Sequence, residues 1–489
     1  MKKIISNAVL FVLPALIATS AVQAQDTTAK KEPGINVNFM DKKVKPTDDF
    51  FRYVNGTWLD NTQIPNDKTR WGSFDELRQK TDTDALTILK EAAKNPIYKS
   101  NTDQGKAINL YKSIMDTVAR NKQGIAPLKP YLAKINAVKN VADLQALLIQ
   151  MAPQGGLGFF GVGIGVDAKN SNRNVINVGP GSVGLPDRDY YVSEDADSKE
   201  KRAKYVLHLT KMLQLIGEKP AEAQANADKI LAFETTMSKP RFDRVERRDR
   251  RKSYNPMTVN DLQKLTPSIN WDSYLSQIGL PKTDSLIVSQ PKYLIALETI
   301  LKENKIDDWK AYMRWTLLNK SASQLSTQLE KANWEFYGKT LTGAVKQRPL
   351  EERALQVING SIGEALGKLY VEKMFPAEAK AKAEKMIANV IKAFQNRILV
   401  LDWMSDETKT KAIEKLDKFT VKIAYPDEWE DYSELQIKED NSFAENMLAV
   451  SEWSLKKNIS EIGQPVDKSE WGMPPQTVNA YFNPLNNEI

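Results

Sequence analysis

The first residues that could bind a ligand are two arginines and an aspartate within a stretch of nine residues. Asp75 and Arg78 are three residues apart at the start of a predicted helix, so their side chains can pair and hold each other's orientation. Arg70 precedes this helix, which leaves its guanidinium group free to bind a carboxylate through two parallel hydrogen bonds. An ordinary surface ion pair explains the same spacing, so the residue types alone leave both interpretations open.

The second group lies near the end of the chain. Apolar and polar residues alternate there and stop before Pro484, which predicts a half-buried strand of Val478, Asn479, Ala480, Tyr481 and Phe482. An exposed strand edge can bind an extended peptide as an additional strand. The Asn479 amide can both donate to and accept from a peptide backbone. A purely structural strand fits the same pattern.

The sequence contains one histidine, His208, and no cysteine. The lack of cysteine excludes a disulfide scaffold, a thiolate zinc site and a cysteine nucleophile. Without partner histidines, His208 is predicted to be a residue on the surface or boundary of a helix rather than a metal ligand or a general base.

A glycine-rich stretch matches the dinucleotide-binding fingerprint letter for letter, from Gly156 to Gly161. That fingerprint needs a strand before it and a helix after it, because the free amides of the helix hold the pyrophosphate. Here glycines continue to Gly165 and no helix follows, so we interpret the match as accidental. The alternating pattern of 155–167 and the apolar segment 174–178 predict a small β-hairpin instead.

Most other segments have helical periodicity, so the elements that must position these residues are mainly helices. Pro46 to Asp49 is typical of a helix start, and the apolar residues that follow have helical spacing. The sequence predicts a mainly α fold with a small β insertion. Further amphipathic runs are predicted at 74–93, 104–120, 140–151, 199–216, 221–238, 292–303, 307–340, 348–374, 377–401 and 406–418.

The N-terminus has the pattern of a cleavable signal peptide. Two lysines precede an apolar run, and small residues precede the expected cleavage before Gln25. We therefore expect a signal peptide at 1–24, a flexible tether at 25–45, a mainly helical region at 46–445 and a further region at 446–489. The protein is predicted to be exported, periplasmic or secreted, without a membrane anchor after cleavage.

The formal charge is +7, and the densest basic cluster runs from Arg241 to Lys252. Asp243, Glu246 and Asp249 interrupt this cluster. Interleaved acids favour a solvated surface laced with salt bridges over a nucleic-acid-binding patch. We expect no nucleic-acid partner.

Five ordered sequence blocks, spread over nearly all of the predicted mature chain, resemble the neprilysin and endothelin-converting-enzyme family of zinc metallopeptidases. The blocks are Asp48–Leu59, Gly184–Tyr191, Asn396–Lys409, Lys422–Trp429 and Glu470–Pro484. The resemblance implies a bacterial secreted member with a mainly helical, two-lobed fold that encloses a large cavity. It also implies that peptides, rather than folded proteins, are the substrates.

The resemblance also assigns roles to the two groups described first. By this likeness, Asn479 binds the substrate backbone and the Ala480 carbonyl accepts a substrate amide. Arg70 corresponds to the arginine that recognises a substrate's C-terminal carboxylate, and Asp75 and Arg78 correspond to its partners in that subsite. These five residues are the substrate-binding residues that the sequence predicts.

The family's zinc site, in contrast, has no matching positions. Family members hold zinc with the two histidines of a His-Glu-x-x-His motif and a downstream glutamate, and the motif's own glutamate activates a zinc-bound water. This sequence contains no such motif. We therefore expect an N-terminal portion with an incomplete catalytic lobe, no catalytic residue, no metal ligand, no bound zinc and no hydrolysis by this chain.

Two functions remain open at this point. The chain is the N-terminal part of a zinc metalloendopeptidase that acts on oligopeptides, or it is a non-catalytic periplasmic peptide-binding module. Ten tryptophans suggest a carbohydrate-binding protein as a third class, which the family blocks disfavour. The sequence predicts neither the identity of the substrate nor the oligomeric state.

Overall fold

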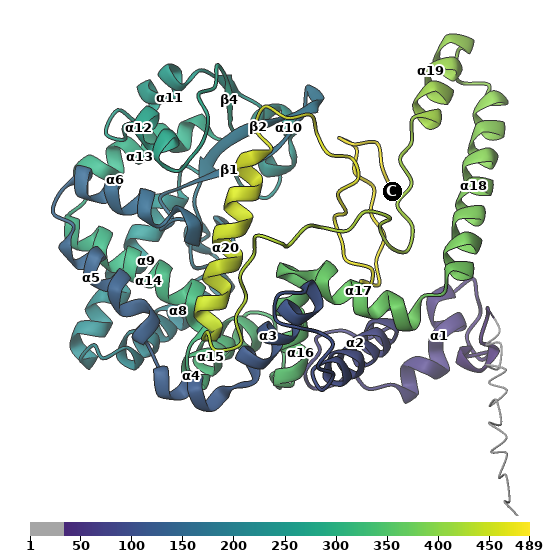
Figure 1. Ribbon diagram of the computed structural model, residues 1–489, viewed down its shortest axis with the longest axis horizontal. Helices are drawn as coiled ribbons and strands as arrows, with labels where there is room; N and C mark the ends of the chain where they lie inside the picture. Colours follow the sequence, from purple (N-terminus) through teal and green to yellow (C-terminus); the bar gives the residue numbers. More distant parts are fainter. Residues whose placement is uncertain (1–33) are drawn as a thin grey trace, which may run out of the picture. The chain divides into compact units, whose positions relative to one another are not determined.

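The computed structural model describes residues 34–489 (Figure 1). The predicted signal peptide, 1–24, and the part of the predicted tether before residue 34 lie outside the described residues. The chain divides into two units, with the boundary between Gln63 and Ile64.

The described part of the first unit consists of a short turn and one helix. Asp49 begins helix α1 (Phe50–Asn61) as predicted, because its carboxylate accepts a hydrogen bond from the Arg52 amide at 2.8 Å. The preceding segment contains the 3₁₀ turn η1 (Val37–Phe39) and returns to α1, where Thr57 Oγ1 donates to the Met40 carbonyl at 2.8 Å. Gly56 permits this approach, since a Cβ there would lie 2.5 Å from Cβ of Asp41.

The second unit is mainly helical, which confirms the predicted fold class. Its α-helices are α2 (Ser73–Ala92), α3 (Asp103–Met115), α4 (Thr117–Gln123), α5 (Lys129–Ala137), α6 (Val141–Gln150), α7 (Asp189–Val192), α8 (Ala196–Leu215), α9 (Pro220–Ser238), α10 (Arg250–Ser253), α11 (Val259–Leu265), α12 (Trp271–Gln277), α13 (Pro291–Glu303), α14 (Ile306–Ser321), α15 (Thr327–Trp334), α16 (Leu350–Ser361), α17 (Gly363–Met374), α18 (Ala377–Leu399), α19 (Asp406–Asp417) and α20 (Phe443–Ser460). Shorter turns are η2 (Ala126–Leu128), η3 (Ala152–Gln154), η4 (Glu246–Arg248), η5 (Ala322–Gln324) and the π-helical η6 (Glu335–Thr340).

Three predicted helical runs are broken, and one long helix was not predicted. The run 104–120 divides at Asp116 into α3 and α4. The run 307–340 divides into α14, α15 and η6, and the run 348–374 divides at Ile362 into α16 and α17. Helix α20 was not among the predicted runs, and of its eighteen residues Phe443, Asn446 and Val450 are buried.

The predicted β-hairpin is present and belongs to a four-stranded sheet. Strands β1 (Phe160–Asp167) and β2 (Asn170–Pro180) pair antiparallel, and the short β4 (Leu286–Val288) and β3 (Pro256–Met257) complete the order β1-β2-β4-β3. The glycines of the dinucleotide-like match lead into β1 and its hairpin rather than into a helix. The fingerprint is therefore accidental, as predicted.

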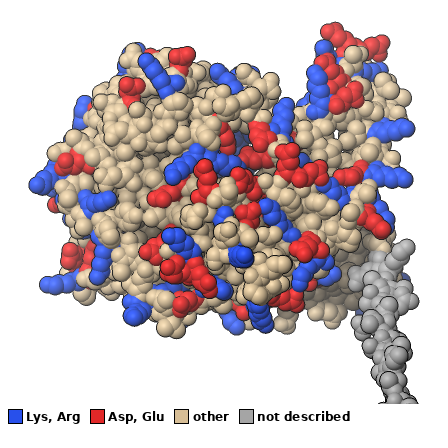
Figure 2. All heavy atoms as spheres, in the orientation of Figure 1, with Lys and Arg blue, Asp and Glu red and all other residues tan. Residues whose placement is uncertain are grey.

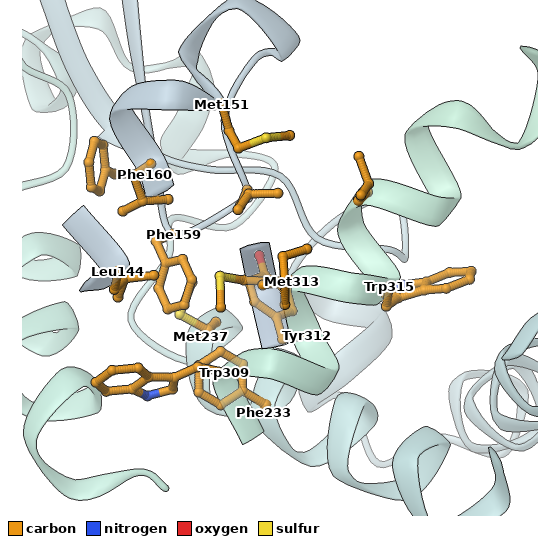
Figure 3. Packing of buried hydrophobic residues seen from close by; sticks show 14 of the residues in the cluster. Leu144, Met151, Phe159, Phe160, Phe233, Met237, Trp309, Tyr312, Met313 and Trp315 are labelled. Carbon is orange, nitrogen blue, oxygen red and sulfur yellow. The ribbon is translucent and has the colours of Figure 1, made fainter. Parts of the chain in front are cut away.

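Buried side chains of the second unit form two clusters. The larger cluster surrounds the sheet with helices from α5 to α15, and Figure 3 shows Phe159, Phe233 and Tyr312 packed at its centre. The ring of Phe159 meets the edge of Tyr312 with centroids 5.5 Å apart. The smaller cluster joins α2, α3, α16, α17 and α20 to the segment 432–437.

A buried carboxylate in the larger cluster holds the sequence block that begins at Gly184. Glu234 of α9 accepts hydrogen bonds from the Gly184 amide at 2.9 Å, the Tyr191 hydroxyl at 2.8 Å and the Tyr205 hydroxyl at 2.9 Å. Burial raises the pKa of Glu234 to about 7, although the three donors oppose the shift. This family block therefore has a structural explanation, since Glu234 ties it to α8 and α9.

The prediction for His208 is wrong, because the side chain is buried. Only 6% of the residue is exposed, and its ring stacks on Phe336 with centroids 4.7 Å apart and planes 9° apart. Burial, with a smaller effect from the charge of Lys211, lowers the pKa of His208 to about 3, so the imidazole is neutral. Phe336 belongs to η6, far along the chain, and helical spacing around His208 gave no sign of this contact.

The basic cluster from Arg241 to Lys252 contains the predicted salt bridges but is not one continuous helix. Lys252 Nζ lies 3.1 Å from Glu246 Oε1, and Arg251 Nε lies 3.1 Å from Asp249 Oδ1. Arg244 pairs instead with Asp187, outside the cluster, at 2.6 Å. On the face drawn in Figure 2, acidic and basic side chains are interspersed. The absence of a nucleic-acid partner stays a prediction.

Candidate functional site

Helix α2 brings together the three charged residues predicted near its start. Gly72 precedes the helix, and its carbonyl accepts the Asp75 amide at 2.8 Å, which places Asp75 in the first turn. Arg78 Nη1 lies 3.5 Å and Arg70 Nε 3.8 Å from the same oxygen, Asp75 Oδ1. Asp75 therefore lies between two guanidinium groups and orients both. The Arg70 side chain is 75% exposed, so most of its hydrogen-bonding surface remains accessible.

These three residues line a pocket of about 420 Å³. Its other walls come from the end of α15, η6 and the loop 341–349. The loop is fixed beside α2 because the amides of Val345 and Lys346 both donate to the Asn66 carbonyl, at 3.0 and 2.8 Å. A pocket of this size can hold one or two residues of a peptide.

Asp82, one helical turn beyond Arg78, forms part of the pocket wall. Burial, and next the negative charge of Glu352, raise the pKa of this carboxyl group. The positive charges of Lys68, Arg348 and Arg78 oppose that shift. Burial outweighs the nearby cations, so the pKa of Asp82 is raised in spite of them.

The terminal segment reaches the same cluster. Arg78 Nε donates to the Val478 carbonyl at 3.5 Å, although 400 residues separate them. Asn479 and Ala480 follow directly and are both exposed. Asn479 Oδ1 accepts the Ala480 amide at 2.9 Å, so the Asn479 carboxamide is oriented by its own backbone. The structure thus places the two predicted groups next to each other.

The prediction of a strand over 478–482 is wrong. These residues are irregular, and nearby pairing is limited to isolated bridges, such as that between Asn483 and Glu488. A local turn uses the Thr477 amide, which donates to the Pro474 carbonyl at 3.0 Å. Phe482 is 49% exposed and stacks on Phe419, so apolar alternation here does not mark a face packed against the core. The substrate-binding roles of Asn479 and Ala480 stay predictions.

Two glycines of α17, which sequence reasoning missed, position the terminal segment. A Cβ at Gly363 would lie 2.7 Å from Cγ of Pro474, and one at Gly367 would lie 2.9 Å from Cδ of Pro475. The buried Gln476 then donates from Nε2 to the Gly363 carbonyl at 2.9 Å. The four-residue spacing of these glycines on one helix face, in a sequence with a Pro-Pro pair, was the available signal.

The end of the segment is held by a buried ion pair. Lys422 Nζ lies 2.7 Å from Glu488 Oε2, and both side chains are almost fully buried. The Tyr481 hydroxyl donates to the other carboxylate oxygen of Glu488 at 3.2 Å. The segment with Asn479 and Ala480 is therefore fixed at both ends, by Gln476 before it and by Glu488 after it.

The described residues do not fit a zinc ion. His208 lies among Trp315, Phe336 and Tyr337 in the core, which offer no second zinc ligand. Within residues 34–489, no three histidine, cysteine, aspartate or glutamate side chains are grouped closely enough to hold a metal. That this chain binds no zinc stays a prediction. In the same part of the chain, no helix has the length and apolar character needed to cross a membrane.

Comparison with curated proteins finds relatives that are similar to this chain over most of its length. The chain is 32% identical to Neprilysin-3 of Drosophila melanogaster over 478 residues, which cover 92% of this chain and 60% of that relative. It is 28% identical to endothelin-converting enzyme 1 of Rattus norvegicus, covering 93% of this chain and 61% of that relative. The chain therefore spans about three fifths of the length of these curated relatives.

Comparison with solved structures also finds proteins of similar fold. A crystal structure of the Mycobacterium tuberculosis zinc metalloprotease ZMP1 with an inhibitor matches with a TM-score of 0.86 and 34% identity. This match covers 93% of the present chain and 69% of ZMP1. The PEPO structure from Lactobacillus rhamnosis has the same fold, with a TM-score of 0.83 at 21% identity. Residues 46–426 match peptidase family M13, and the chain therefore belongs to this family of neprilysin-type zinc metallopeptidases.

Proposed function

We propose that this chain provides the peptide-binding part of a zinc metalloendopeptidase that acts on oligopeptides. Arg70 would bind the substrate's C-terminal carboxylate, Asp75 would orient Arg70, and Arg78 would line the same subsite. Asn479 would bind the substrate backbone, and the Ala480 carbonyl would accept a substrate amide. In the family, zinc supplies the activated water, and no step through zinc is assigned to the described residues.

One observation carries this proposal. The contact of Arg78 Nε with the Val478 carbonyl supports a single site, because Asn479 then follows directly beside the cluster of Asp75 with Arg70 and Arg78. Each of these two groups, taken alone, is also explained by an ordinary structural role at the protein surface. Together they offer a guanidinium for a chain end and exposed amide groups for an extended backbone, which are the two features that fix a peptide's direction and register.

Peptide binding by the 489-residue chain tests the proposal. We would measure the affinity of an N-acetylated pentapeptide with a free C-terminal carboxylate and of the same peptide with a C-terminal amide. Because the Arg70 side chain is mostly exposed and solvent screens its pair with a carboxylate, we expect the amide to bind about threefold more weakly. Arg70→Gln should remove that difference, and Asn479→Ala should weaken both peptides equally.

The matched control is Arg248→Gln, an exposed arginine outside the pocket. This variant should bind both peptides as the unsubstituted chain does. Equal binding of the acid and the amide by the unsubstituted chain would refute the assignment to Arg70.

The alternative, a peptide-binding module without catalysis, shares the same binding site. For this chain both functions predict substoichiometric zinc and no cleavage of peptides. One tightly bound zinc ion per chain would overturn that expectation. We also propose export of the protein, periplasmic or secreted, and an N-terminus beginning at Gln25 in the exported product would support it.

A further inference from the structure

Two cations of the pocket beside Arg70 form no salt bridge among the described residues, although the charge of one of them, Arg348, acts on the Asp82 carboxyl group. The lining of this pocket includes six basic residues and three acidic ones; the basic residues are Lys68, Arg70, Arg78, Lys346, Arg348 and Arg353. Most of these cations are already neutralised. Among the described residues, Arg348 and Lys346 have no carboxylate oxygen within 4.0 Å.

Lys68 and Arg353, two other cations of the pocket, form salt bridges with nearby carboxylates. Lys68 Nζ lies 3.1 Å from Asp67 Oδ2 and 3.2 Å from Glu352 Oε2. Arg353 Nε lies 2.9 Å from Glu330 Oε1, and Glu330 also pairs with a buried arginine, so this group belongs to the scaffold. Neither side chain is available to a ligand.

The backbone holds Arg348 at the pocket wall. Two residues before it, the Lys346 amide is bonded to the Asn66 carbonyl, which lies four residues before Arg70. Directly after it, Pro349 begins helix α16, whose first turn is fixed. The Arg348 carbonyl also accepts from Arg353 Nη1. Arg348 is therefore a half-buried cation on an anchored backbone, whereas Lys346 is exposed at the rim.

An unpaired guanidinium in a half-buried pocket favours an anionic ligand, because the desolvated charge gains more from a carboxylate than from water. Resting on the proposed function, in which Arg70 binds the C-terminal carboxylate, the side chain of that same terminal residue would enter the pocket that Arg348 also lines. We propose that Arg348, assisted by Lys346, is a specificity-determining residue that selects peptides ending in glutamate or aspartate.

The test uses three N-acetylated pentapeptides that differ only at the end: C-terminal glutamate, C-terminal glutamine, and glutamate with a C-terminal amide. We expect the 489-residue chain to bind the glutamate peptide about tenfold more tightly than the glutamine peptide, as a charge-assisted pair predicts. Arg348→Gln should abolish this preference and leave the affinity for the glutamine peptide unchanged. Arg348→Lys should restore part of the preference.

Lys346→Gln should reduce the preference by about twofold, because an exposed charge is screened by solvent. Arg248→Gln is the control and should leave the preference unchanged. A thermal melt of each variant confirms that it is folded, and Arg348→Lys keeps the test decisive if Arg348→Gln does not fold.

The outcomes separate this inference from the proposed function. Equal binding of the glutamate and glutamine peptides, together with weaker binding of the amide, would refute the role of Arg348 alone. Equal binding of the acid and amide forms would refute the role of Arg70. A uniform loss for all three peptides in Arg348→Gln would show that Arg348 shapes the pocket without selecting a side chain, and would overturn the inference.

Discussion

Two pairs of neighbouring helices in the second unit were both predicted from helical periodicity, yet they have opposite burial. Helices α8 and α9 pack together in the larger cluster, and thirteen of their residues are buried. Helices α18 and α19 also contact each other, yet none of their 35 residues is buried. Figure 1 shows α18 and α19 as a pair that projects from the rest of this unit.

The difference lies in what covers each pair. Helices α14 and α15 and the element η6 pack on α8 and α9, whereas the apolar stripe of α18 has no such cover among the described residues. That stripe contains Met386, Val390 and Phe394, which are 59%, 45% and 58% exposed. An apolar stripe with a four-residue repeat therefore predicts a helix and the face that could be buried, but not the partner.

The largest effect should come from Phe233→Ser in α9. The Phe233 ring packs 5.1 Å from Tyr312 and 6.1 Å from Phe159, and only 3% of the residue is exposed. Loss of the ring leaves a cavity with a buried hydroxyl, so we expect a loss of about 4–6 kcal/mol in the free energy of unfolding. Urea denaturation measures it, and a loss below about 2 kcal/mol would contradict the burial of this helix.

The next effect should come from Glu234→Ala on the same helix. Its removal leaves the Gly184 amide and the hydroxyls of Tyr191 and Tyr205 without their acceptor in the core. We expect a loss of about 3–4 kcal/mol, again by urea denaturation. Lys229→Ala, an exposed position of α9, is the matched control and should change the free energy of unfolding by less than about 0.5 kcal/mol.

A third effect should appear as pH dependence from His208. Its folded pKa of about 3 lies below the ordinary value of 6.5, so the unfolded chain binds more protons between these values. The associated stability is present above pH 6.5 and is lost as the pH falls toward 3. At pH 4.5 the loss should reach about 2–3 kcal/mol.

The matched variant His208→Leu lacks the titrating imidazole, so comparison with it gives the contribution of His208 to the pH dependence of the free energy of unfolding. Glu234 acts in the opposite direction between pH 4.5 and 7, because its raised pKa makes the folded state bind more protons there. Lys211 is the charged group that contributes to the shift of His208. The difference between wild type and His208→Leu cancels the Glu234 contribution. A difference that does not change with pH would show that His208 is not buried in solution.

These helices also show what the sequence could predict. Periodicity placed the helices of 199–216, 221–238 and 377–401 within a few residues, since local spacing determines them. It did not reveal that His208 meets Phe336 or that Glu234 meets Gly184, because those contacts join segments far apart in the chain. Only the structure therefore shows which of these residues are buried and what they contact.

In the candidate site, too, the sequence predicted a local contact and missed one between distant segments. Residue spacing predicted the pairing of Asp75 with Arg78, which are three residues apart on one helix. The contact between Arg78 and Val478 depends on the fold of the intervening 400 residues, and no local pattern reports it. Alternation predicted a strand over 478–482, whereas the segment is fixed by Gln476 and Glu488 at its ends rather than by pairing with a neighbouring strand.

The smallest effect, and the most informative one, should come from Phe394→Ser in α18. It is the same substitution as Phe233→Ser on another predicted helix, but Phe394 is more than half exposed. The removed contacts are mostly with solvent, so the free energy of unfolding should change by less than about 0.5 kcal/mol.

Self-association provides a second measurement of the same face, since exposed apolar side chains in one row promote it. Phe394→Ser should reduce concentration-dependent association in sedimentation velocity, whereas Lys392→Ser, an exposed position two residues away, should not. A loss above about 2 kcal/mol in Phe394→Ser would mean that the α18 face is covered in solution, and the contrast with α8 and α9 would then disappear. The matched pair of phenylalanines thus tests whether burial follows the partner rather than the pattern.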